Sequence, residues 1–217
     1  MTTTNRADSY SAAEEATNIV SHAIGLAFSI AALALLVVRA AAYGTVWHVV
    51  SCSIFGSSLI ILFAASTVYH SARTPARRGR LRILDHASIY CLIAGTYTPF
   101  ALITLRGPVG WVIFGISWGI ALAGIILKLF FTGRYKRLST LMYVGMGWIG
   151  IFAVKPLVHN LPAEGLFWLV SGGMAYTIGA TLYSIKKIPF NHAIFHVFVL
   201  IGGVSHFVAV FCYVLPS

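Results

Sequence analysis

Three histidines stand at the ends of long apolar segments, where ionisable side chains are uncommon. His192 and His196 are four residues apart, so on a helix they share one face about one turn from each other. That spacing suits two ligands of a single metal ion. His70 ends another apolar segment, with Ser66 one turn before it on the same face. Each feature alone also fits a simpler interpretation: chance spacing for the pair, and an interfacial histidine for His70.

Asp85 stands at the start of a further apolar segment, in the run Leu84-Asp85-His86-Ala87-Ser88. Ionisable groups inside membrane helices are expensive to bury and usually functional. A carboxylate at the first residues of a helix is also favourable as a cap, because it pairs with free backbone N–H groups. Helix capping is therefore the simpler interpretation of Asp85, and a role beside the histidines is the alternative.

The overall composition predicts the elements that position these residues. Of the 217 residues, 59% are apolar and only 9% are charged, whereas a soluble domain usually has about 25% charged residues. A helix needs about 20 apolar residues to cross a bilayer. We therefore predict an all-α, polytopic membrane protein, with a short cytoplasmic segment at 1–17 and one membrane domain at 18–214. Its seven transmembrane helices are expected at 18–39, 46–70, 84–104, 109–131, 139–158, 165–185 and 191–214.

The first apolar segment, at 23–38, could be mistaken for a cleavable signal peptide, because three alanines, Ala40–Ala42, follow it. A signal peptide begins with a positively charged region. Here Arg6 is the one basic residue before the apolar segment, against three acidic residues. The segment is therefore interpreted as the first transmembrane helix.

Lysine and arginine positions predict the orientation in the membrane. Three basic residues, Arg39, Arg106 and Lys155, fall on one side. The other side has 11, namely Arg6, Arg73, Arg77, Arg78, Arg80, Arg82, Arg134, Lys136, Arg137, Lys186 and Lys187. Because cytoplasmic loops carry the excess of basic residues, the N-terminus is expected in the cytoplasm and the C-terminus outside, in a multi-pass protein of the cell membrane. The net charge of +10 then reflects insertion and anionic lipid head groups, and no nucleic-acid partner is expected.

This topology places the candidate residues at a similar depth. The second helix would run inward and end at His70, while the third and seventh would run outward, beginning near Asp85 and His192. His192 and His196 differ in depth by about 6 Å at 1.5 Å per residue. Three histidines that leave a fourth position open are the ligand set of a catalytic zinc, although iron, nickel and copper also bind imidazole. Asp85 would orient the water at that position or accept its proton.

Other polar residues are harder to assign. His206 lies ten residues beyond His196, which is about 15 Å along the helix axis, so a buried hydrogen bond is expected for it. Asn18 and His22 share a face near the start of the first helix, with Glu14 one turn before. They form either a capped polar network or part of the surroundings of the metal site.

The remaining small residues are expected to have packing roles. Cys52, Cys91 and Cys212 lie in apolar helices without a CxxC pair, so we expect small buried hydrophobes and no disulfides. Gly115 and Gly119 form a small-xxx-small pair, which we interpret as close helix packing rather than dimerisation.

At the polar residues the sequence resembles a known family, the hemolysin III branch of the progestin and adipoQ receptor (PAQR) superfamily. The similarity spans nearly the whole chain. Its motifs are EEATNIVSH at 14–22, STVYH at 66–70, LDHASIY at 84–90, AGTYTPF at 94–100, HAIFHVF at 192–198 and SHF at 205–207.

The resemblance implies roles for particular positions. In the related adiponectin receptors the histidine of the second-helix motif and both histidines of HxxxH bind zinc, which corresponds to His70, His192 and His196 here. The third-helix aspartate, matching Asp85, contacts the water on the zinc, and the second-helix serine, matching Ser66, lies beside it. The superfamily also includes alkaline ceramidases. This chain lacks the long cytoplasmic N-terminal region of the receptors, which weakens the expectation of a hormone-receptor role.

Three functions are compatible with these observations. The first is a zinc-dependent hydrolase of a membrane lipid amide or ester, with Asp85 as general base and Ser66 assisting. The second is a receptor or membrane-homeostasis protein with structural zinc, whose site would more often be closed by four protein ligands. The third is a cytolytic or transport protein, which would need polar residues further along its helices.

Overall fold

The computed structural model describes residues 10–131 and 136–216, and all of the regular structure in them is helical. Seven helices are long and apolar enough to cross a membrane, which confirms the predicted all-α membrane fold. Of the basic residues used for the orientation, Arg6 and Arg134 lie outside the described residues. The elements are α1 (Ala12–Tyr43), α2 (Val46–Ser71), α3 (Pro75–Pro99), the π-helical turn η2 (Phe100–Thr104), α4 (Pro108–Phe131), α5 (Lys136–Gly147), the 3₁₀ turn η3 (Ile149–Ala153), α6 (Val154–Asn160), α7 (Ala163–Ser184), α8 (Asn191–Ala209) and the π-helical turn η4 (Val210–Val214).

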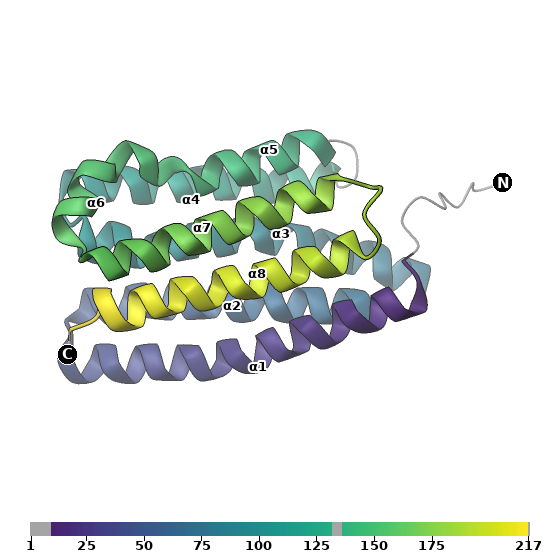
Figure 1. Ribbon diagram of the computed structural model, residues 1–217, viewed down its shortest axis with the longest axis horizontal. Helices are drawn as coiled ribbons and strands as arrows, with labels where there is room; N and C mark the ends of the chain where they lie inside the picture. The colour runs from purple at the N-terminus through teal and green to yellow at the C-terminus, as the bar shows by residue number, and fades with distance from the viewer. Residues whose placement is uncertain (1–9, 132–135, 217) are drawn as a thin grey trace.

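The helices run side by side along the length of the molecule (Figure 1). Helix α1 packs against α2 and α8, α3 lies between α2 and α4, and α7 packs against α8. Because the number of crossings is odd, α1 begins at one end and the chain finishes at the other. We call the end where α1 begins, on the right of Figure 1, the N-terminal end of the bundle. Helix α2 ends there, and α3 and α8 begin there.

Helix α1 begins six residues earlier than predicted. Ser11 caps it, since its side chain accepts a hydrogen bond of 3.1 Å from the Glu14 backbone N–H. The first turns consist of alanine and glutamate, which favour a helix but are too polar for a hydropathy scan to include. Helix α1 therefore includes polar turns before the apolar segment, and Glu15 is one of its helical residues.

Helix α3 begins nine residues before the transmembrane span predicted at 84–104. The helix begins at Pro75, which favours a first helical turn, and the basic residues from Arg77 to Arg82 lie on its first two turns rather than in a loop. Asp85 is thus ten residues inside α3, so the simpler interpretation that it caps the helix does not hold. Its buried carboxyl needs another explanation.

The predicted continuous helix at 139–158 is interrupted at Trp148, between α5 and η3. The hydroxyl of Tyr97 from α3 occupies the interruption: it donates to the Gly147 carbonyl at 2.6 Å and accepts from the Gly150 N–H at 3.0 Å. A side chain that inserts into the backbone ladder is a common cause of a helix break. Periodicity along one segment cannot reveal it, because the inserted residue comes from another helix.

Two packing expectations were wrong. Within the described residues, a Cβ atom on Gly115 or Gly119 would have nothing within 4 Å, so this pair makes no close contact inside the chain. Of the three cysteines, Cys52 is buried as expected, but Cys91 is half-buried and Cys212 is exposed on the bundle surface. All three are free, in agreement with the expected absence of disulfides.

Candidate metal centre

The structure brings His70, His192 and His196 together at the N-terminal end of the bundle. His192 Nε2 lies 3.1 Å from His70 Nε2 and 2.9 Å from His196 Nε2. One potential ligand atom from each residue lies within 4.8 Å of the others, and all three side chains are buried. Residues from α2 and α8, 122 positions apart in the chain, thus form one cluster that can bind a metal ion.

The start of α8 fixes the two histidines that it contributes. Phe190 adopts a left-handed backbone conformation, with φ of 57°, immediately before the helix. The Asn191 side chain then donates to the Tyr183 carbonyl at 2.8 Å, so the beginning of α8 is tied to the end of α7. Because the helix begins at a fixed residue, the four-residue spacing turns both imidazoles toward α2.

The second ring nitrogen of each histidine also meets a hydrogen-bonding group. His70 Nδ1 lies 2.6 Å from the carboxylate of Glu15, and His192 Nδ1 lies 3.0 Å from the Tyr10 hydroxyl. His196 Nδ1 lies 3.4 Å from the backbone carbonyl of Asn18, a longer contact. All three rings therefore point Nε2 at one another and Nδ1 outward.

This arrangement fits a cation at the centre. A carboxylate and a backbone carbonyl only accept hydrogen bonds, so Nδ1 of His70 and of His196 must carry the proton. Neutral rings protonated at Nδ1 have lone pairs on Nε2, and those lone pairs would face one another across about 3 Å. A positive ion between them removes the repulsion. Imidazole nitrogens 2.0–2.1 Å from a tetrahedral zinc lie about 3.3 Å apart, close to the separations found here.

Asp85 and Ser66 lie beside this cluster but outside it. Asp85 is buried, with 8% of its surface exposed, and its carboxyl interacts with the side chain of Ser66, one turn before His70. Ser66 Oγ makes no hydrogen bond of normal geometry among the described residues. Asp85 is not among the residues whose ligand atoms converge. Asp85 is therefore a buried carboxyl near the cluster that is not one of its candidate metal ligands.

The two other buried histidines differ in their relation to the site. The His22 ring stacks on the His196 ring, with centroids 3.6 Å apart and planes at 15°. Both His22 nitrogens lack a hydrogen-bond partner among the described residues. His206 lies away from the cluster, and its Nδ1 bonds the Gly202 carbonyl at 2.7 Å, which confirms the buried hydrogen bond expected for it.

Sequence reasoning did not single out Glu15 and Tyr10, which contact the histidines directly. It considered Glu14, whereas Glu15 is the residue that faces His70. A signal for Glu15 was present: Glu15, Asn18 and His22 follow the helical spacing of three and four residues, so they share one face. No comparable pattern pointed to Tyr10, which precedes α1 and reaches the site through the fold.

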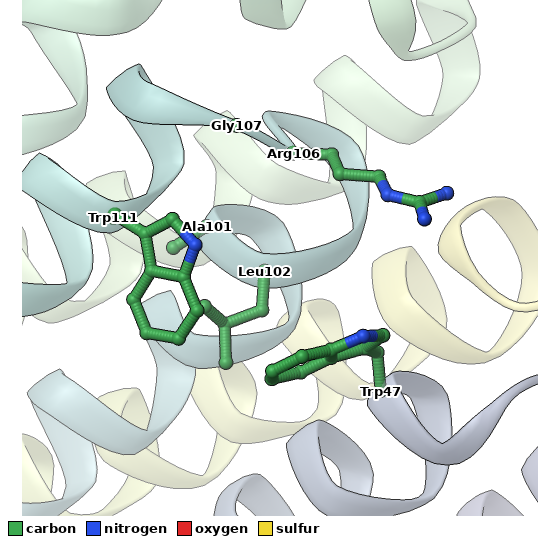
Figure 2. A pocket seen from close by; sticks show the side chains of 6 residues that line it. All are labelled: Trp47, Ala101, Leu102, Arg106, Gly107 and Trp111. Carbon is green, nitrogen blue, oxygen red and sulfur yellow. The ribbon is translucent and has the colours of Figure 1, made fainter.

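Two surface pockets of the protein do not include the clustered histidines in their lining. One pocket, of about 250 Å³, is at the far end of the bundle and is lined by Trp47, Ala101, Leu102, Arg106, Gly107 and Trp111. Figure 2 shows its two tryptophans on either side of Leu102. The other, of about 420 Å³, lies at the turn between α2 and α3 and is lined by Val68, Ser71, Ala72, Arg73, Thr74, Arg77 and Leu81. Neither pocket is lined by a residue of the candidate site.

Fold and site together define a multi-pass, seven-helix membrane protein with a buried three-histidine cluster. Residues 10–207 match the haemolysin-III related family, and the chain belongs to that family. It is 48% identical to Hemolysin-3 of Bacillus cereus, over 94% of this chain and 93% of that protein. It is 29% identical to human Monocyte to macrophage differentiation factor, over 79% of this chain and 73% of that protein. It is 28% identical to Heptahelical transmembrane protein ADIPOR2 of Oryza sativa, over 68% and 74%. The predicted resemblance is confirmed.

Proposed function

We propose that this protein is a zinc-dependent hydrolase of a membrane lipid amide or ester. The observation that carries the proposal is the convergence of three imidazole Nε2 atoms without a fourth protein ligand among the described residues. Such a set leaves one coordination position for water, as catalytic zinc sites do, whereas structural sites are usually closed by four protein ligands. The substrate is proposed to be a lipid because the cluster lies within the membrane-spanning helices.

In this proposal each residue has a distinct task. Zinc, when bound, supplies polarisation of the carbonyl and a lowered pKa of its water ligand. His70, His192 and His196 hold it at a fixed depth. Asp85 accepts a proton from the attacking water, and later donates it to the leaving group. Ser66, whose side chain interacts with the Asp85 carboxyl, orients that carboxyl.

The test is the substitution Asp85→Asn in the purified full-length chain. Asparagine has nearly the same shape as aspartate but cannot accept the proton, so zinc should stay bound while turnover falls by about 10²–10⁴. Activity is measured by mass spectrometry on a panel of ceramides and related lipid amides and esters. The control is Glu164→Gln, the same carboxyl-to-amide change near the start of α7, at the far end of the bundle. Wild-type protein with full zinc that hydrolyses none of these lipids contradicts the proposal.

The second candidate function is a receptor or membrane-homeostasis protein with structural zinc. It is favoured by one observation: the three histidines of the cluster are all buried, so the site is enclosed by the helices around it. The same variant separates the two candidates. Loss of zinc from Asp85→Asn would make Asp85 a ligand, close the site and support the structural role.

We also propose that the N-terminal end of the bundle faces the cytoplasm, so the metal site lies at that face. The support is the 11-to-3 distribution of basic residues in the sequence. A reporter that is active only in the cytoplasm, fused after Ser217, should be silent, and the same reporter before Met1 should be active. Activity of the C-terminal fusion contradicts this orientation.

A further inference from the structure

We infer that the N-terminal segment from Tyr10 to Asn18 is the positioning element of the metal site, and that Glu15 is its principal residue. This inference rests on the proposed zinc site. The segment contributes no ligand to the converging set, yet it provides the outer partner of every histidine: the Glu15 carboxylate, the Tyr10 hydroxyl and the Asn18 carbonyl. The three candidate ligands come from two helices, and their outer contacts come from one short stretch that includes the first turns of α1 and the residue before its N-cap.

The chemistry of these partners determines which nitrogen faces the metal. A neutral histidine carries its proton on either Nδ1 or Nε2, and the hydrogen bond of one nitrogen decides the form. Glu15 only accepts, so it holds the proton on His70 Nδ1 and leaves the Nε2 lone pair for the metal. A ligating histidine held in this way by a carboxylate is correctly oriented and more basic. Without Glu15, the ring of His70 would populate both forms.

Glu15 is in turn held by a residue of α3. The Arg78 guanidinium forms an ion pair with the second carboxylate oxygen of Glu15. The same guanidinium lies over the ring of Tyr69, 4.9 Å from its centroid. One Glu15 oxygen therefore faces His70 and the other faces Arg78, which fixes the carboxylate at both oxygens. The chain of contacts runs from α3 through α1 to the ligand on α2.

The three contacts of the segment differ in length and in charge, so the three residues should differ in their importance for zinc binding. The contact of Glu15 with His70 is the shortest, at 2.6 Å, and it involves a charged acceptor. The Tyr10 contact with His192 is neutral and longer, at 3.0 Å, and Tyr10 also covers that ring with centroids 4.7 Å apart. The contact of Asn18 with His196 uses the backbone carbonyl, so a side-chain substitution does not remove it, and the Asn18 side-chain Nδ2 is 3.5 Å from His70 Nδ1, a longer contact than that of Glu15. Glu15 is therefore the residue whose loss should matter most.

The experiment measures zinc affinity of the full-length chain in detergent by competition with a chromogenic chelator. Glu15→Ala should weaken zinc binding by about 10–100-fold, the usual effect of removing such a partner. Glu15→Gln should recover part of the loss, because the amide oxygen still accepts a hydrogen bond. The matched control is Glu14→Ala, which removes the same charge one position away, and it should bind zinc as the wild type does. Tyr10→Phe should have a smaller effect than Glu15→Ala.

A second readout separates positioning from general stability. Nitrogen-15 spectra of the histidine rings in the metal-free protein report which nitrogen carries the proton. His70 should be protonated at Nδ1 in the wild type and in Glu14→Ala, and should become a mixture of both forms in Glu15→Ala. Arg78→Ala should produce a weaker version of the same change, and Arg77→Ala, on the exposed side of the helix, should produce none.

The outcomes distinguish the inference from the proposed function. Wild-type affinity and an unchanged His70 ring in Glu15→Ala overturn the positioning role while the zinc site stands. An equal loss in Glu14→Ala and Glu15→Ala also overturns it, since the effect would then be one of charge alone. A wild-type protein that binds no zinc overturns the zinc proposal itself, and the inference with it.

Discussion

Helix α8 contains buried histidines in two different settings, His196 near its start and His206 near its end. His196 Nε2 lies 2.9 Å from another imidazole nitrogen, and its ring also stacks on His22. His206 bonds a backbone carbonyl of its own helix, and its ring stacks on Tyr176 with centroids 5.3 Å apart. Both side chains are almost completely enclosed. Burial of a histidine therefore says little about its role.

The difference lies in what the second nitrogen meets. In His196, the outward Nδ1 approaches a carbonyl of α1, and Nε2 faces the nitrogen of His192 in the cluster. In His206, Nδ1 is satisfied locally, and a Cβ atom on Gly172 of α7 would collide with the ring, so the residue fills the close crossing of α7 and α8. His196 belongs to the cluster that can bind a metal ion, and His206 belongs to the packing of α7 against α8.

The largest expected effect is on zinc content, when His196 and His206 are replaced separately. His196→Ala should lose nearly all of its zinc, because two histidines and water cannot replace three ligands. His206→Ala should keep one zinc per folded chain. Metal content is measured by plasma mass spectrometry on monodisperse protein. Equal zinc in both variants, or loss from His206→Ala alone, would break the distinction between the two histidines.

A substitution at the α7–α8 crossing tests the packing side of the comparison. Gly172→Ala places a methyl group against the His206 ring and should destabilise the fold by about 1–3 kcal/mol, as overpacking does. Gly173→Ala is the matched control, since a Cβ atom there has nothing within 4 Å. Thermal unfolding in detergent measures both variants. The idea fails if Gly172→Ala is as stable as Gly173→Ala, or if its zinc affinity per folded chain falls.

The smallest expected effect concerns two serines of α2 that are both buried without a hydrogen bond of normal geometry, Ser66 and Ser51. They are about 22 Å apart along the helix, and only Ser66 lies at the metal end. Ser66→Ala should slow hydrolysis by up to about tenfold, because it removes the interaction of Ser66 with the Asp85 carboxyl, and leave zinc in place. Ser51→Ala should change neither. A rate for Ser66→Ala equal to that of Ser51→Ala would remove Ser66 from the mechanism.

The sequence was sufficient for the membrane fold and for the three converging histidines. Each membrane-crossing helix needs a long apolar segment, which can be recognised without the rest of the chain. Because successive helices alternate in direction, His70, His192 and His196 then fall at one end of the bundle. The helix starts were less accurate, because Ser11 and Pro75 begin helices in polar sequence that hydropathy excludes. Hydropathy and the alternating direction of the helices therefore predict the depth of a residue in the membrane, but not the residue at which a helix begins in polar sequence.

Contacts made by residues of other helices could not be predicted. Tyr97 of α3 occupies the interruption between α5 and η3. Tyr10 contacts His192, which is 182 positions further along the chain. The helical spacing of Glu15 and Asn18 placed them on one face, but only the packing of α1 against α2 and α8 shows which residues that face meets. A local pattern such as that of His192 and His196 can be read from the sequence, whereas the residues of other helices that contact them are known only from the fold.

The most direct test of the central claim is X-ray absorption at the zinc edge on the purified full-length protein, together with its metal content. One zinc per chain is expected, surrounded by three imidazole nitrogens at about 2.0–2.1 Å and one water oxygen. Protein that contains no zinc would contradict the site. A fourth ligand from the protein, such as a carboxylate oxygen of Asp85, would contradict the open position on which the proposed hydrolysis depends.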